Sequence, residues 1–194
     1  GTLILFPEDA PAAIPYVTEE NQVIKDVAEW QKYVKVPDLA GKCSEGWEEA
    51  LEAKSRIDQE KYLTMVVMGT GIFEQLHMLM TFEDTLMNFL LEPEAMHELI
   101  DVICEYRLTY MKLVVENLHP DCIVSHDDWG AKDSLFMSPE VWREFFKEPY
   151  RKLYDYLHSQ GVIVMHHADS YLEPIVEDMA EIGVDIWQGV LNTN

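Results

Sequence analysis

The sequence has 194 residues, of which 48% are hydrophobic, enough for the core of one domain. Its 36 acidic side chains outnumber the 14 basic ones, giving a formal net charge of −22. That charge argues against binding to nucleic acid or to anionic membrane surfaces, both of which need basic patches. The sequence has no apolar run long enough to span a bilayer and no basic leader, and its three cysteines lie far apart. We therefore expect a cytoplasmic protein with reduced thiols.

The first 43 residues contain four prolines and are predicted to form a loop-rich entry segment. They include a candidate strand over 2–6 and an amphipathic helix over 23–34. The next predicted helix covers 44–57 and begins at Ser44, because serine is favoured at helix N-termini.

From residue 62 onward the pattern alternates between strands and helices. It predicts four strands, at 62–69, 121–125, 161–165 and 184–187. It predicts helices at 72–80 and 83–91, a long helix from Pro93, a helix from 138 to about 157 that breaks or kinks at Pro149, and a helix at 172–183. This alternation indicates βα units around a parallel sheet, and therefore an α/β fold.

Polar side chains follow three of the predicted strands directly, and the carboxyl ends of strands carry the chemistry in (β/α) barrels. We therefore expect His126, Asp127 or Asp128, His166 and Gln188 to line one cavity at that end of the sheet. The alternative is that these residues only cap strands or form solvated turns.

Asp127, Asp128 and His166 are the candidate catalytic residues. Adjacent carboxylates can raise one pKa for acid–base work, and histidine suits proton transfer or metal binding. His166 and Asp169 are the candidate metal ligands, with a loop cap as the alternative role for Asp169. Strand alternation predicts that His167 points away from His166. The candidate substrate-binding residues are His126, Trp129, His167 and Gln188.

Two stretches of the sequence carry a family resemblance: HDDWGAKDSLFMSPEVWREFFKEPYRKLYDYLHSQG at 126–161 and HHADSYLEPIVEDMAEIGVDIWQGV at 166–190. They contain an aspartate-rich strand end, a serine-proline helix start, an aromatic run leading to Pro-Tyr, and a Gly-Val-Asp strand. In this order the chain resembles the uroporphyrinogen decarboxylase superfamily. The resemblance implies a TIM-type (β/α)8 barrel and an enzyme.

The resemblance implies one of two chemistries. Decarboxylation of uroporphyrinogen in haem biosynthesis needs no cofactor and uses an arginine-bearing N-terminal loop. In this sequence, Arg56 is the only arginine within residues 1–60. Methyl transfer with a corrinoid carried by a partner protein usually also uses zinc, bound by a His-x-Cys motif. That motif reads His166-His167-Ala168 here, so the histidine matches and the cysteine does not.

Electrostatics favours the second chemistry, because the many carboxylates of a tetrapyrrole substrate call for arginines, and Arg107, Arg143 and Arg151 fall on predicted helices. We expect corrinoid-linked methyl transfer that involves a small-molecule substrate. The alternatives are uroporphyrinogen decarboxylation and a non-catalytic barrel relative that binds a protein partner.

A closed (β/α)8 barrel typically needs about 250 residues. Four clear strands and the candidate strand at 2–6 predict an incomplete barrel, with residues 1–194 forming a single domain. An open sheet leaves strand edges unpaired. We therefore expect the chain either to be a segment of a longer barrel or to complete its sheet as a homo-oligomer.

Overall fold

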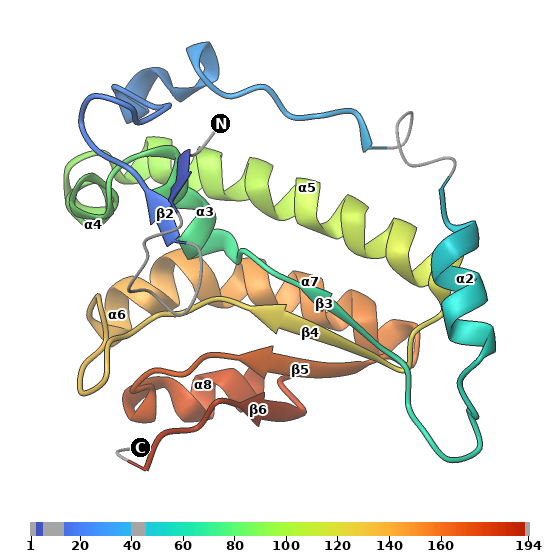
Figure 1. Ribbon diagram of the computed structural model, residues 1–194. Helices are drawn as coiled ribbons and strands as arrows, with labels where there is room; N and C mark the ends of the chain where they lie inside the picture. Colours follow the sequence, from blue (N-terminus) through green and yellow to red (C-terminus); the bar gives the residue numbers. More distant parts are fainter. Residues whose placement is uncertain (1–2, 6–13, 40–45, 193–194) are drawn as a thin grey trace.

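The computed structural model describes residues 3–5, 14–39 and 46–192 (Figure 1). One parallel sheet has the strand order β3-β4-β5-β6, so neighbouring strands follow one another along the chain. Its strands are β3 (Met65–Met68), β4 (Cys122–His126), β5 (Ile163–His167) and β6 (Ile186–Gln188). The predicted α/β class and its four strands are confirmed, and the sheet is an arc of a (β/α) barrel.

The candidate strand at 2–6 has a different place from the one expected. Strand β1 (Leu3–Leu5) pairs antiparallel with β2 (Ile14–Tyr16) in a separate two-stranded sheet. Parallel pairing requires a crossover of a dozen or more residues, and these two strands are closer than that in the sequence. Strand β1 is therefore not a fifth strand of the parallel sheet.

The two helices predicted before the first parallel strand are shorter than expected. The 23–34 segment contains a 3-10 helix, η1 (Val27–Lys32), because the Asp26 side chain accepts a hydrogen bond from Ala28 N and starts the helix there. Helix α2 (Glu48–Ser55) lies within the predicted 44–57 range, and Ser44 lies outside the described residues. Lys54 of α2 binds the carbonyl oxygens of Leu118 and His119, fixing α2 to the end of the long helix.

Three helices lie between β3 and β4: α3 (Ile72–Leu79), α4 (Phe82–Leu91) and α5 (Pro93–Leu118). All three were predicted. Thr81 caps α4 through its side-chain oxygen, and α5 ends at His119 in a left-handed conformation. None of the helices in the described part of the chain is both long enough and apolar enough to cross a membrane.

The helix predicted from residue 138 runs without a break through Pro149. It consists of α6 (Pro139–Trp142), a π-helical turn η2 (Arg143–Lys147) and α7 (Glu148–Ser159). Proline has no N–H for the regular helical ladder, and the π-helical turn lies directly before it. The break expected at Pro149 is therefore wrong: the helix changes from π to α after Lys147 and continues through the proline. The last helical segment combines a 3-10 turn, η3 (Glu173–Ile175), with α8 (Val176–Glu181).

The two faces of the parallel sheet differ in burial. On the helix face, Ile123, Val164 and His166 are fully buried; α5 packs against α7, and α7 packs against β5 (Figure 1). On the other face, which we call the open face, Met65 and Val67 of β3 are 54% and 65% exposed, whereas Cys122 and Val124 of β4, in register with them, are buried. The open face corresponds to the interior of a closed barrel. Completion of the sheet by further βα units or by a second copy stays a prediction.

Candidate active site at the mouth of the sheet

Three side chains form a row at the carboxyl end of the open face. His126, His167 and Gln188 are paired in register across β4, β5 and β6, so they belong to the same face of the sheet. The two imidazole rings lie 4.7 Å apart between centroids, and His167 Nδ1 is hydrogen-bonded to Gln188 Oε1. We call these three residues the mouth row.

Two carboxylates flank His126. Glu74 Oε2 lies 3.6 Å from His126 Nδ1, and Asp128 Oδ2 lies 3.5 Å from His126 Nε2. Glu74, His126 and Asp128 each offer a ligand atom, and these atoms all lie within 4.8 Å of one another. We call these three residues the mouth cluster. Sequence analysis missed Glu74, although its place three residues after Gly71 is the spacing of a capping box at a helix start.

The mouth cluster holds its two carboxylates in different electrostatic states. Burial raises the pKa of Glu74 to about 7, and the nearby charge of Asp127 adds to this. Burial alone would also raise the pKa of Asp128, but the hydrogen bond with His126, the charge of that ring and the hydrogen bond from the Asp169 backbone N–H together lower that pKa. The hydrogen bond with Asp128 raises the pKa of His126. Near neutral pH, therefore, the Asp128 carboxylate is charged, whereas Glu74 is present in both its protonated and its charged form.

Asp127 lies on the other side of β4, in a fully buried position. Its carboxylate accepts hydrogen bonds from Phe73 N and Glu74 N, both at 2.9 Å, from Trp129 Nε1 at 2.9 Å and from the Tyr150 hydroxyl at 2.5 Å. Burial raises its pKa, and these donors oppose the rise. Asp127 therefore joins the start of α3 to the strand end and to α7.

His166 is fully buried on the helix face. The Asp127 carbonyl can only accept, so His166 Nε2 donates to it at 3.2 Å, and Nδ1 accepts from the Tyr154 hydroxyl at 2.9 Å. The Trp129 ring stacks on the imidazole with 4.2 Å between centroids. Burial lowers the pKa of His166 to about 3, so the ring is neutral and both nitrogens are engaged.

The zinc ligands implied by the resemblance do not fit this arrangement. His166 has no ring nitrogen left for a metal, and Ala168 is buried and has no side-chain ligand atom. The other predicted ligand, Asp169, is exposed, and its role as a ligand stays a prediction. Within residues 3–5, 14–39 and 46–192, the one group of three metal-binding side chains close enough to share an ion is the mouth cluster.

The structure brings together part of the predicted cavity and separates the rest. His126, Asp128, His167 and Gln188 meet at the mouth. The predicted residues on the buried side are Asp127, Trp129 and His166. His167 does point away from His166, as strand alternation predicts, but His167 is the one that belongs to the open face. The catalytic and substrate-binding roles of all these residues stay predictions.

One predicted helix residue reaches a strand end. Arg107 belongs to α5, as expected, but its buried guanidinium donates to the carbonyl oxygen of Thr70 in the turn after β3. Thr70 has a positive φ of 57°, which is uncommon for a β-branched residue. Arg107 thus supports the strained turn that leads into α3 and Glu74.

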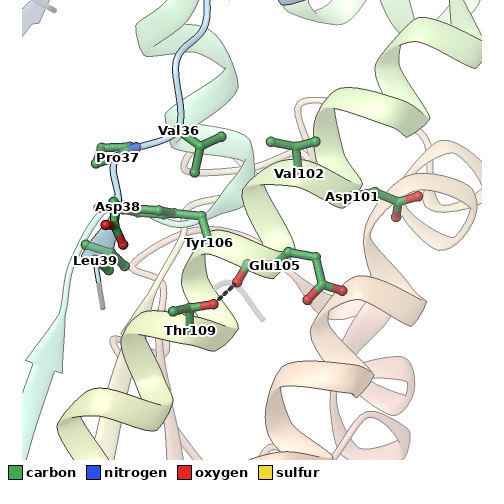
Figure 2. Close-up of a pocket in the computed structure, with 9 residues that line it drawn as sticks. All are labelled: Val36, Pro37, Asp38, Leu39, Asp101, Val102, Glu105, Tyr106 and Thr109. Atoms are coloured by element: carbon green, nitrogen blue, oxygen red, sulfur yellow. Dashed lines mark hydrogen bonds between the residues drawn. The ribbon is translucent and has the colours of Figure 1, made fainter. Parts of the chain in front are cut away.

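A separate cavity lies on the far side of α5 from the mouth. Figure 2 shows the segment around Val36 and Pro37 facing Val102 and Tyr106 of α5, while Thr109 is hydrogen-bonded back to the Glu105 carbonyl at 2.9 Å. Its lining includes no residue of the mouth row or the mouth cluster. It is therefore separate from the strand-end residues.

Comparison with known proteins gives a family for the chain. A search of curated protein sequences found no match. The family model described as Uroporphyrinogen decarboxylase (URO-D) matches residues 3–189, which include the whole parallel sheet and the mouth. The chain belongs to the uroporphyrinogen decarboxylase (URO-D) family.

Proposed function

We propose that this protein is an enzyme that transfers a methyl group between a corrinoid carried by a partner protein and a small thiol. One observation carries the choice over decarboxylation. The side chains in contact at the mouth are two carboxylates, two imidazoles and an amide, and no arginine or lysine among the described residues forms an ion pair with Glu74 or Asp128. Such a surface repels a tetrapyrrole substrate rich in carboxylates.

His167 is the residue that we assign to receive the thiol proton. Gln188 Oε1 can only accept a hydrogen bond, so His167 Nδ1 carries the proton and Nε2 keeps its lone pair. Transfer replaces the carbon–cobalt bond of the donor with a carbon–sulfur bond, leaves the electron pair on cobalt, and requires removal of the thiol proton. Gln188 orients the imidazole for that removal.

The test compares the two chemistries in one preparation. Methylcobalamin with 2-mercaptoethanol serves as the methyl-transfer probe, followed by the visible spectrum of the corrinoid. Uroporphyrinogen serves as the decarboxylation probe, followed by separation of the porphyrin products. We expect methyl transfer and no decarboxylation, and a loss of about 100-fold in the methyl-transfer rate for His167→Ala.

His119→Asn is the matched control, because His119 lies at the C-terminal end of α5, where asparagine also tolerates the left-handed conformation. This variant should keep the full rate. Robust conversion of uroporphyrinogen by the wild-type protein would overturn the proposal in favour of the decarboxylase, the activity after which the matched family is described.

A further inference from the structure

The mouth cluster combines the geometry and the ligand types of a metal site. One imidazole and two carboxylates present ligand atoms within 4.8 Å of one another. Ligand atoms at about 2.0–2.2 Å from a tetrahedral zinc ion lie roughly 3.4 Å apart. Glu74 and Asp128 lie 3.6 and 3.5 Å from different ring nitrogens of His126, so the imidazole must turn to bring one nitrogen to an ion that both carboxylates also reach.

Both carboxylates of the mouth cluster are held in place by backbone hydrogen bonds. Glu74 Oε2 accepts from Gly71 N at 3.0 Å, and Asp128 Oδ1 accepts from Asp169 N at 3.2 Å. These contacts leave Asp128 Oδ2 directed at His126. Ligands fixed in this way lose little freedom when an ion binds.

The local charge also favours a cation. Glu74 and Asp128 belong to the cluster, and the buried carboxylate of Asp127 lies close enough to affect Glu74. Among the described residues, His126 pairs with both Glu74 and Asp128, and the charge of His167 also acts on Asp128. A divalent ion bound between these carboxylates would neutralise them more fully than one imidazole can.

We propose that Glu74, His126 and Asp128 bind a divalent first-row transition-metal ion. An imidazole with two carboxylates suits ions such as Zn²⁺, and the set contains no thiolate. The side chains of Glu74, His126 and Asp128 are 13%, 29% and 28% exposed, so solvent and a small ligand can reach the remaining coordination positions. The site is distinct from the His166-x-Ala168 positions of the family motif.

Binding of Zn²⁺ to the purified chain tests the site without any methyl donor. Metal-free protein is titrated with Zn²⁺ by calorimetry, and the metal retained after dialysis is measured by mass spectrometry. We expect the wild-type chain to bind one ion. Glu74→Gln, His126→Gln and Asp128→Asn should each lower the Zn²⁺ affinity by at least about tenfold, which is the lower end of the effect of perturbing a metal site.

Asp155→Asn is the matched control, because it makes the same chemical change as Asp128→Asn on an exposed side chain of α7, outside the cluster. It should keep the wild-type affinity. Circular dichroism of each variant checks the fold, and Co²⁺ gives a second readout. Bound Co²⁺ should show visible d–d bands without a thiolate charge-transfer band.

Three results would overturn the metal site: no Zn²⁺ binding by the wild-type chain, unchanged affinity in the folded cluster variants, or loss of binding in Asp155→Asn. Metal binding by the cluster does not require methyl transfer. If the chain binds Zn²⁺ as expected but transfers no methyl group, the metal site stands and only the proposed function fails.

Discussion

The carboxylate of Asp127 occupies the space that a side chain at Gly71 would need. A Cβ built on Gly71 would lie 2.0 Å from Asp127 Cγ, far inside contact distance. The absence of that atom lets Asp127 reach the backbone N–H groups of Phe73 and Glu74 at the start of α3. The position of Glu74 at the mouth therefore depends on a glycine three residues earlier.

Gly71→Ala should lower the free energy of unfolding by about 2 kcal/mol or more, because Asp127 must move and its buried hydrogen bonds are lost. Gly69→Ala is the control, since a Cβ at Gly69 meets nothing within 4 Å. Urea denaturation measures both variants. Equal stability of the two alanine variants would contradict this account of Asp127.

Asp127→Asn should destabilise the protein by about 2–4 kcal/mol, because an amide places two donors where the carboxylate accepts from four groups. Asp128→Asn should cost roughly 1 kcal/mol or less, since Asp128 is only partly buried. Urea denaturation at neutral pH gives both values. A larger loss for Asp128→Asn than for Asp127→Asn would show that the two neighbours have been assigned to the wrong sides of the strand.

His166 should make the protein less stable as the pH falls. Burial lowers its pKa from 6.5 to about 3, so between these values the unfolded chain binds a proton that the folded chain excludes. The stabilisation is complete above pH 6.5 and is lost on acidification at up to about 1.4 kcal/mol per pH unit.

The unfolding free energy of wild type and His166→Gln, measured between about pH 5 and 7, isolates this effect. All other titrating groups, including Glu74 with its raised pKa, are common to both proteins. The wild-type protein should lose stability more steeply toward pH 5 than the variant. Parallel curves for the two proteins would mean that His166 is not buried in a neutral form.

The sequence alone was sufficient for the βα alternation, because apolar runs of strand length and helical periodicities are local properties. It also identified the strand ends, where His126, Asp128, His167 and Gln188 meet. It did not reveal which of two adjacent histidines faces the mouth. A shift of one residue in β5 exchanges the two faces, and the register is set by pairing with β4 and β6.

Other features depended on contacts between segments far apart in the sequence. Glu74 reaches His126 only because α3 begins next to the end of β4, where Asp127 accepts hydrogen bonds from the first N–H groups of α3. The 23–34 segment has helical periodicity, yet Asp26 starts a shorter 3-10 helix there. Local pattern favours a type of element, and capping and tertiary contacts decide its length.

We expect the reaction to take place at the mouth cluster and the mouth row, with His166 and Asp127 supporting them from the buried face. Imidazole ¹H–¹⁵N spectra recorded with and without Zn²⁺ test this most directly, with resonances assigned from His126→Gln, His167→Gln and His166→Gln. Zn²⁺ should shift the ring resonances of His126 and leave those of His166 in the neutral Nε2–H form. A Zn²⁺-induced shift of His166 with no change at His126 would contradict it.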